Sequence, residues 1–221
     1  MGERGPKPKR KVNIRWSPNF AYAIGLIATD GNLSKDGRHI SFTSKDREQI
    51  NNFLFGLKTD VLVSKNISGN KKGVCYRVQF SDIIFYKFLN SIGLFSNKSK
   101  TIGEINIPPK YFFDFLRGCF DGDGTIYSYW DNRWKNSFMF YISFATASLD
   151  FMNWLRFEIK KLLFISGHVK KDGRGSTYQL TYAKKDSEII LKKMYRSVGG
   201  LCLSRKKLKT MSILAIVGKR L

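Results

Sequence analysis

The sequence predicts an α+β protein made of two pseudo-symmetric repeats, each running helix, two strands, helix, two strands, helix. A nine-residue pattern that ends in Asp-Gly occurs twice, 93 residues apart, and the segments downstream of the two copies also match. Between the apolar helical segments, polar and apolar residues alternate with a period of two. That period marks antiparallel strands that bury one face and leave the other wet.

The first copy of the pattern ends a predicted helix over Phe20 to Ala28. Ser17 and Pro18 supply a capping residue and a first-turn proline. The pair Asp30-Gly31 follows the apolar run, at a place where a glycine commonly stops a helix. The local chemistry therefore predicts both ends of this helix.

The second copy ends a predicted helix over Tyr111 to Phe120, which follows two prolines and runs into Asp-Gly-Asp-Gly at residues 121–124. The correspondence between the two halves extends well beyond the pattern. The matched segments are Gly25 with Gly118, Asp30 with Asp123, Gly31 with Gly124, Ile40 to Phe42 with Ile142 to Phe144, Tyr76 to Gln79 with Tyr178 to Thr181, and Asn97 to Ser99 with Arg205 to Lys207. The chain is therefore an internal duplication.

Further elements lie downstream of each motif helix. The predicted strands are His39–Lys45, Tyr76–Phe80 and Tyr178–Tyr182, and the predicted helices are Asp46–Leu57 and Asp150–Leu163. We divide the chain into a basic flexible arm (1–15), a first repeat (16–96), a linker that carries Lys98 (97–110) and a second repeat (111–221).

The charge balance points to a nucleic-acid partner. Lys and Arg number 39 against 17 Asp and Glu, for a formal net charge of +22, and such an excess repels itself unless an anionic partner offsets it. The basic residues are spread along the chain instead of lining one amphipathic helix, which disfavours a membrane surface, and no apolar run predicts a membrane span. A ribosomal or chromatin-type protein is the alternative, although 14% aromatic residues indicate a packed globule.

The cysteines and histidines restrict the kind of metal site. Cys75, Cys119 and Cys202 form no C-x-x-C pair, so no zinc site is predicted. Their odd number, and an N-terminus without an apolar signal segment, predict an intracellular protein of the cytoplasm, nucleoid or an organelle. With only His39 and His168 present, any metal must be held by carboxylates, which suits Mg²⁺.

Asp30 and Asp123 are the predicted metal ligands. Gly25 and Gly118 remove side chains from one face of each motif helix, so the helices can pack closely and bring both carboxylates together at their C-terminal ends. There the two carboxylates repel each other and lie at the negative ends of both helix dipoles. A divalent cation bound between them would turn this repulsion into attraction. Each Asp-Gly taken singly is explained as well by a helix terminator with a turn. Asp121 has Ala28 as its counterpart, so we interpret it as a supporting residue and not a catalytic one.

The two nonamers, AIGLIATDG at 23–31 and LRGCFDGDG at 116–124, resemble the LAGLIDADG motif. From about Phe20 onward the chain resembles a two-motif, single-chain homing endonuclease. The resemblance implies two saddle-shaped sheets packed through the motif helices, in an intron-encoded monomeric enzyme. It further implies a double-strand break in a long asymmetric DNA site, with two or more Mg²⁺ ions that Mn²⁺ or Ca²⁺ can replace for binding.

The same resemblance assigns roles to further residues. The backbone carbonyls of Thr29 and Gly122 join the aspartates in holding metal, and Lys98 and Lys206 lie near the scissile phosphates. Plain phosphate or solvent contacts are the alternative for both lysines in a chain so rich in lysine. Asp46 and Ser148 end the second strand of each half, where a polar side chain often shapes the water network. For Asp46, capping of the next helix is the alternative.

The wet faces of the sheets are the predicted DNA-reading surfaces. The two halves present different side chains, which implies an asymmetric target. Candidate readers in the first half are Ser34, Asp36, His39, Ser41, Thr43, Lys65, Arg77 and Gln79. Those in the second half are Tyr127, Tyr129, Arg133, Lys170, Lys171, Arg174, Gln179 and Thr181. Each of them taken alone is equally compatible with an ordinary solvated strand residue.

Other functions fit the sequence less well. An RNA-splicing maturase or a non-cleaving DNA-binding protein on the same fold would have lost cleavage, whereas both motif aspartates are present. An intein would need a Cys or Ser at the splice junction and a terminal His-Asn pair, and the chain begins Met1-Gly2 and ends Arg220-Leu221. A purely structural basic protein is the remaining alternative.

Overall fold

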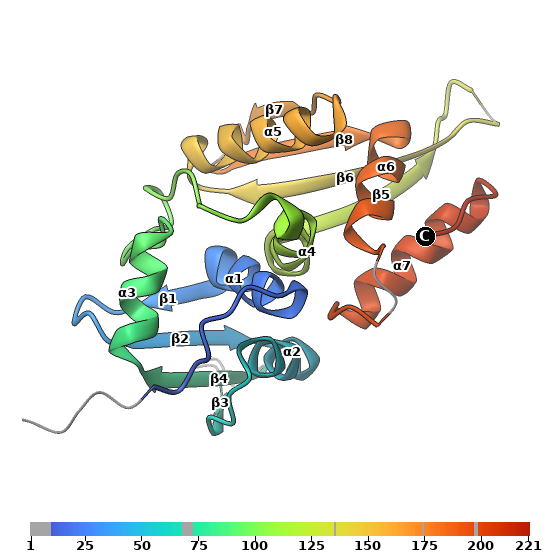
Figure 1. Cartoon of the computed structure of the whole chain (residues 1–221). Helices are drawn as coiled ribbons and strands as arrows, with labels where there is room; N and C mark the ends of the chain where they lie inside the picture. The colour runs from blue at the N-terminus through green and yellow to red at the C-terminus, as the bar shows by residue number, and fades with distance from the viewer. Residues whose placement is uncertain (1–9, 68–72, 135, 174, 197–198) are drawn as a thin grey trace, which may run out of the picture.

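The computed structural model describes residues 10–67, 73–134, 136–173, 175–196 and 199–221, which form two repeats (Figure 1). The first repeat consists of α1 (Pro18–Asp30), β1 (Gly31–Leu33), β2 (His39–Ser44), α2 (Arg47–Leu57), β3 (Val63–Ile67), β4 (Val74–Ser81) and α3 (Ile83–Ser91). The second consists of a 3-10 turn η1 (Pro109–Tyr111), α4 (Phe112–Asp123), β5 (Gly124–Trp130), β6 (Phe138–Thr146), α5 (Leu149–Leu163), β7 (His168–Lys171), β8 (Tyr178–Ala183) and α6 (Lys184–Met194). A further helix, α7 (Ser204–Ile216), follows the second repeat.

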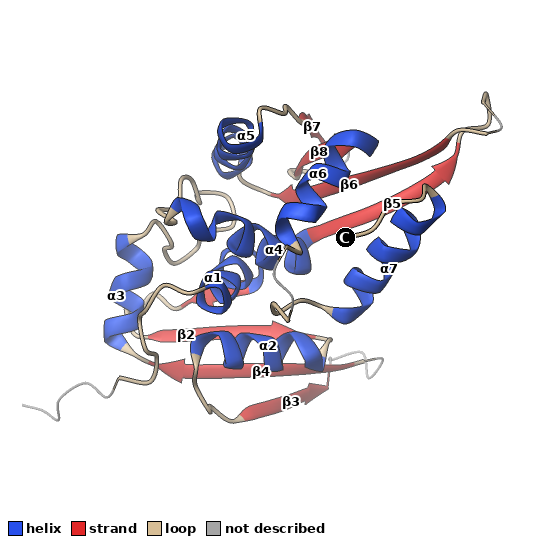
Figure 2. Ribbon diagram, turned by 45° about the vertical axis from the view of Figure 1, so that its right-hand side comes forward, coloured by secondary structure: helices blue, strands red, loops and turns tan. Residues whose placement is uncertain are grey.

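Each repeat contains a four-stranded antiparallel sheet, and the strand orders correspond: β1-β2-β4-β3 and β5-β6-β8-β7. The registers correspond as well, because Ser41 of β2 pairs with Gln79 of β4, and Ser143 of β6 pairs with Thr181 of β8. The helices α1 and α4 lie side by side between the sheets (Figures 1 and 2). The predicted fold class, two similar αββαββα repeats joined through the motif helices, is confirmed.

The motif helices are buried on almost all sides. Every residue of α1 from Phe20 to Ala28 is buried, as expected for a helix that is apolar all round. The apolar side chains of both repeats form one continuous core. Helix α4 is buried from Phe112 to Asp121, but it takes charged side chains into this core. Among the described residues, no helix has both the length and the apolar character needed to cross a membrane.

The ends of α1 follow the predicted chemistry with one difference. The Ser17 hydroxyl caps the helix by accepting a hydrogen bond from Phe20 N at 3.1 Å. Gly31 follows the last helical residue, as predicted, but its φ of −75° is extended and not left-handed. A Cβ on Gly31 would lie 2.6 Å from the Ile27 Cα, and a Cβ on Gly124 would lie 2.6 Å from the Phe120 Cα. The glycines are therefore needed because the chain leaves each helix close to its own last turn.

The N-terminal segment differs from the predicted flexible arm. Val12 is fully buried, and the backbone N–H groups of Lys11 and Val12 donate to Asp82 Oδ2 at 2.7 and 3.0 Å. Asp82 also caps α3, because its Oδ1 accepts from Phe85 N. Residues 10–15 of the predicted arm are thus fixed to the first repeat, and residues 1–9 lie outside the described residues.

Candidate active site

The two motif helices touch through their glycines. A Cβ on Gly25 would lie 2.2 Å from the Phe115 carbonyl oxygen, and one on Gly118 would lie 2.1 Å from the Tyr22 carbonyl oxygen. The contact is therefore backbone against backbone, with no space for a methyl group. Both helices end in an aspartate, Asp30 on α1 and Asp123 on α4, so this crossing brings the two carboxylates together as predicted.

The two aspartates influence each other electrostatically. Burial against the neighbouring helix, followed by the Asp123 charge, raises the pKa of Asp30 to about 6. Burial also raises the pKa of Asp123, although Lys206 and Lys98 oppose that shift. A Cβ on Gly122 would lie 2.8 Å from Asp30 Oδ2, so the Asp30 carboxylate rests against the last turn of α4. Like charges held this closely are typical of a site that binds a cation.

Lys98 and Lys206 lie beside the carboxylates, and both amines are buried. The Lys98 amine donates to the Gly31 carbonyl oxygen, just beyond the end of α1. The Lys206 amine donates to the carbonyls of Phe120, Asp121, Gly122 and Gly124, at 2.5 to 3.2 Å. Burial lowers the pKa of each lysine to about 8, while the nearby aspartates raise it. The structure thus brings the four predicted catalytic residues together, with each lysine at the negative end of one motif helix.

The remaining predicted metal donors also lie at these helix ends. The Thr29 hydroxyl donates to carbonyls of its own helix, and the Gly122 carbonyl accepts from Lys206 at 3.2 Å. Among the described residues there is no group of three or more His, Cys, Asp or Glu side chains that could hold a metal. Two carboxylates with carbonyl oxygens form a hard donor set, which fits a cation that keeps several water ligands, as Mg²⁺ does.

Asp121 connects α4 to other parts of the structure. Its carboxylate is buried and accepts hydrogen bonds from the Tyr22 hydroxyl at 2.8 Å and from Leu203 N at 2.6 Å. Burial raises its pKa to about 6, although these two hydrogen bonds oppose the shift. Its backbone carbonyl accepts from Gln49 of α2 at 3.1 Å. Gln49 was not recognised in the sequence, where nothing distinguishes it from a solvated helix residue.

Asp46 and Ser148 occupy equivalent places, at the N-caps of α2 and α5. Ser148 caps its helix and donates its hydroxyl to the Ile102 carbonyl oxygen. Asp46 makes no side-chain cap and forms an ion pair with Arg205 at 2.9 Å. The capping alternative for Asp46 is therefore wrong, whereas Ser148, for which no capping was predicted, does cap its helix.

Solved structures share this architecture at low sequence identity. The homing endonuclease I-LtrWI bound to target DNA matches with a TM-score of 0.63 and 12% identity, covering 91% of each chain. I-WcaI bound to its DNA recognition sequence matches with a TM-score of 0.59 and 16% identity, covering 87% of this chain and 86% of that one. The N-terminal LAGLIDADG domain of DUF199/WhiA matches at 0.53 and 18%, covering 86% and 88%. The chain has the LAGLIDADG fold. No protein-family model and no curated protein sequence matches it.

The LAGLIDADG fold of this chain has two outer sheet faces, the faces turned away from the buried residues. On β2, Ile40 and Phe42 point into the core, so the residues that alternate with them point outward. Strand pairing places the following predicted readers on the outer face of the first sheet: His39, Ser41, Thr43, Arg77 and Gln79. The same argument places the following on the outer face of the second sheet: Tyr127, Tyr129, Lys170, Gln179 and Thr181.

Two predicted readers lie on the wrong face. Lys65 pairs with Tyr76, and Lys171 pairs with Tyr178, so each lysine shares the helix-bearing face of its sheet with partly buried tyrosines. β3 and β7 are short edge strands, and their sequences do not show which face each lysine takes. We therefore withdraw both lysines from the predicted reading surface.

The other predicted readers lie in turns. Ser34 and Asp36 occupy the β1–β2 connection, where Asp36 accepts hydrogen bonds from Arg38 N and His39 N at 3.1 Å and contacts the His39 ring. Arg133 lies in the β5–β6 connection and forms an ion pair with Asp131 at 3.2 Å. Arg174 lies outside the described residues.

The outer faces also carry polar residues that the sequence analysis missed. They include Asn32, Thr125, Tyr141, Ser143 and His168, and each of these is opposite or next to a predicted reader in the strand register. Tyr141 stacks on Tyr127 with ring centroids 5.2 Å apart and on Tyr129 at 6.0 Å. Only the pairing of β5 with β6 could have identified this cluster.

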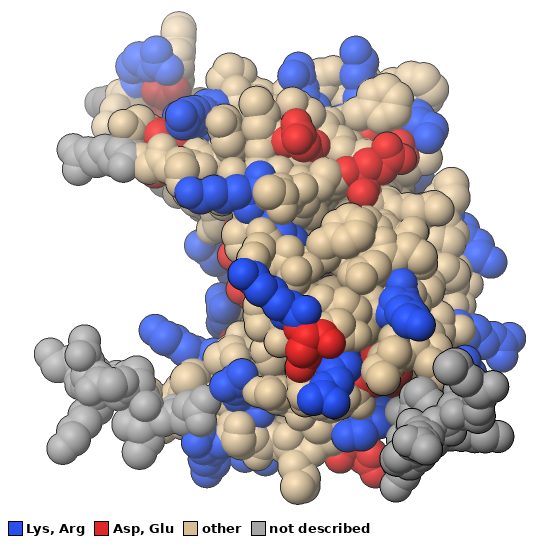
Figure 3. Space-filling model, turned by 90° about the vertical axis from the view of Figure 1, so that its left-hand side faces the viewer, with Lys and Arg blue, Asp and Glu red and all other residues tan. Residues whose placement is uncertain are grey.

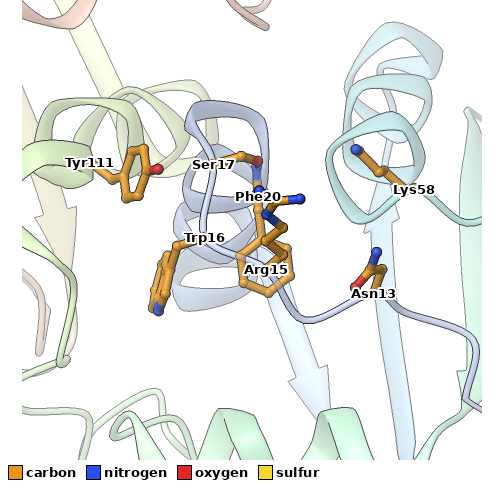
Figure 4. Close-up of a pocket in the computed structure, with 7 residues that line it drawn as sticks. All are labelled: Asn13, Arg15, Trp16, Ser17, Phe20, Lys58 and Tyr111. Carbon is orange, nitrogen blue, oxygen red and sulfur yellow. The ribbon is translucent and has the colours of Figure 1, made fainter.

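The molecule is hollowed between its two lobes, as Figure 3 shows in profile, and lysine and arginine side chains stand along the margin of the hollow. A separate cavity lies at the start of α1, at the end of the helix opposite to Asp30 (Figure 4). Its lining residues are Asn13, Arg15, Trp16, Ser17, Phe20, Lys58 and Tyr111. Because none of the predicted site residues lines this cavity, we do not count it as part of the active site.

Proposed function

We propose that this protein is a site-specific DNA endonuclease that makes a double-strand break by divalent-metal-dependent phosphodiester hydrolysis. The observation that carries the proposal is the meeting of Asp30 and Asp123 at the ends of two crossed helices, with Lys98 and Lys206 beside them. Two carboxylates held against each other and against two helix dipoles are unfavourable in themselves. A bound cation explains why the fold keeps them there.

The residues have distinct roles in this proposal. Asp30 and Asp123 hold the metal, with the carbonyls of Thr29 and Gly122 as further donors. When bound, the metal supplies the means to activate a water and to stabilise charge on the phosphate oxygens. Lys98 and Lys206 place positive charge beside the site, which favours the approach of a phosphate. The two buried amines also fix the carbonyl-bearing ends of the motif helices.

The rest of the molecule supports a DNA partner. Its net charge of +22 needs an anionic partner, and the hollow carries basic side chains along its margin. The outer sheet faces present polar and aromatic side chains suited to base edges in the major groove. Structures with this fold include I-LtrWI and I-WcaI bound to DNA.

The asymmetry of the two faces supports a monomeric enzyme with a long, non-palindromic target. Arg77 and Gln79 of the first sheet have Gln179 and Thr181 as their counterparts in the second. Because one chain supplies both halves of the site, no second copy is needed. We therefore expect one protein chain to bind one duplex.

The experiment is cleavage of a randomised duplex library in Mg²⁺, with the cut ends sequenced to find the target. Asp30→Asn and Asp123→Asn should each abolish double-strand cleavage of that target and leave duplex binding largely unchanged. Asp60→Asn is the matched control, because it removes an exposed carboxylate near the far end of α2. Parental cleavage of both strands by either motif variant would refute the proposed active site.

A second candidate function is DNA binding without cleavage. It is favoured by the similarity to DUF199/WhiA, which shares the fold and is not described as a homing endonuclease. Selection of a specific duplex by the parent protein, with no strand broken in Mg²⁺ or Mn²⁺, would support this second function.

A further inference from the structure

Lys206 belongs to α7, and the start of α7 is held by the first repeat. The backbone N–H of Ser204 donates to both carboxylate oxygens of Glu48 at 3.1 Å, and the Ser204 hydroxyl donates to one of them. Arg205 Nε pairs with Asp46 Oδ2 at 2.9 Å. Asp46 and Glu48 both lie at the start of α2. Helix α7 has no N-cap side chain of its own, so Glu48 supplies the missing acceptor.

Lys98 is held in a related way by the second repeat. It lies in an irregular segment after α3, where the N–H groups of Thr101 and Ile102 donate to its carbonyl at 3.0 and 2.7 Å. The Ile102 carbonyl in turn accepts the hydroxyl of Ser148, at the start of α5. Helix α5 is the counterpart of α2, so the same position in each repeat contacts the lysine-bearing segment of the other.

We propose that Glu48 and Ser148 are positioning residues: Glu48, together with Asp46, places Lys206, and Ser148 places Lys98, each across the boundary between the repeats. This assignment gives Asp46 and Ser148 a role that neither helix capping nor water binding covers. Each lysine reaches its carbonyls from a segment outside the sheets, so the geometry of the amine depends on how that segment is anchored. Two separate anchors also allow one lysine to be disturbed without the other.

The first test measures the accessibility of each lysine in the protein alone, and so does not depend on cleavage. The full chain is treated with a water-soluble acetylating reagent, and acetylation of Lys98 and Lys206 is followed by mass spectrometry. Glu48→Ala should speed acetylation of Lys206 by about tenfold, the factor expected when one charge-assisted hydrogen bond no longer opposes local opening. Lys98 should react at the parental rate. Ser148→Ala should produce the opposite pattern.

Two further variants make the result specific. Glu158→Ala removes a carboxylate from α5 whose ion pair is with Lys161 on the surface, so it should change neither rate. Ser148→Thr keeps the hydroxyl and should restore the parental rate of Lys98. Unchanged rates in Glu48→Ala and Ser148→Ala would overturn the proposal. Equal acceleration of both lysines would do the same, because it would indicate general loosening.

The second test rests on the proposed function and uses the duplex recovered from the library, with the two strands labelled separately. Glu48→Ala should slow mainly the strand that Lys206→Met slows, and Ser148→Ala mainly the strand that Lys98→Met slows. We expect the cleavage rate of that strand to fall by about tenfold. This is a smaller loss than the one, on the order of 10²-fold, that a full 1 Å displacement can produce. Equal slowing of both strands would refute the crossed anchoring. A parent that cuts neither strand would refute the proposed function and leave the acetylation result intact.

Discussion

The contact between the motif helices makes a sharp prediction for Gly118→Ala. The new Cβ would lie 2.1 Å from the Tyr22 carbonyl oxygen, whereas real Cβ contacts under 3.0 Å essentially do not occur. The atom it meets is backbone, so no side chain can rotate away and the helices must separate by about 1 Å. Overpacking of this kind costs about 1–3 kcal/mol, and we expect the upper end because the contact is backbone to backbone.

Two measurements check this prediction. For a chain of this length, 1 kcal/mol shifts the melting temperature by about 2–4 °C, so a loss of about 3 kcal/mol lowers it by about 6–12 °C. The same separation moves Asp123 relative to Asp30, and a shift of about 1 Å can reduce a catalytic rate on the order of 10²-fold. The variant should therefore lose stability and cleavage together. Gly25→Ala, whose Cβ would lie 2.2 Å from the Phe115 carbonyl oxygen, should behave alike.

The matched control is Gly173→Ala, whose added Cβ would have no atom within 4 Å. It should melt and cleave like the parent. If Gly118→Ala also melted and cleaved like the parent, the two helices would not touch at this glycine. The reasoning that brings the aspartates together would then be wrong.

Three further predictions concern the core and the charge of the molecule. Arg117→Leu leaves buried Asp114 without its ion-pair partner at 2.9 Å. The free energy of unfolding, measured by denaturant titration, should therefore fall by about 3–5 kcal/mol. A loss below about 1 kcal/mol would show that the ion pair does not stabilise the fold in this way. Burial raises the pKa of Asp121 to about 6. The protonated carboxyl therefore contributes up to about 3 kcal/mol to the free energy of unfolding below pH 4. This contribution disappears as the pH rises through 6. Asp121→Asn should flatten this part of the pH–stability curve, and an unchanged curve would refute it. If the protein contacts about 6–10 phosphates, its affinity for the duplex should fall about 10³–10⁵-fold between about 50 and 200 mM salt. Filter binding can measure this change in affinity.

The sequence was sufficient for the features that repeat. Asp30 and Asp123 could be located because each follows an apolar run and precedes a glycine, and because the two sites occupy equivalent places in a duplication. The glycines at 25 and 118 predicted the close helix contact, which the backbone distances confirm. The strands were predictable wherever a clear alternation, such as that of Ile40 and Phe42, marks a buried face.

What does not repeat, or depends on partners far away in the chain, could not be predicted. The face taken by Lys65 follows from its pairing with Tyr76, which the sequence of β3 does not reveal. The fixed position of Val12 depends on Asp82, 70 residues away. The contact between Glu48 and Ser204 joins α2 to α7, whose counterpart in the first repeat, the segment around Lys98, is not helical, so a comparison of the halves could not indicate it.

The charged side chains buried on α4 make the contact between the two halves of this chain asymmetric. Asp114, Arg117 and Asp121 stand where α1 carries Ala21, Ile24 and Ala28. In a symmetric pair of second repeats, Asp121 would face Phe115 in place of Tyr22 and would lose the phenol that donates to it. Such a homodimer would bury an Asp121 carboxylate that keeps the Leu203 N–H as a donor but has lost the phenol, which is unfavourable. The contact between Tyr22 and Asp121 therefore favours the pairing of the two unlike helices over the pairing of two second repeats. Exchange of half-sites between engineered nucleases of this fold would need to transplant the helix contact together with the sheet.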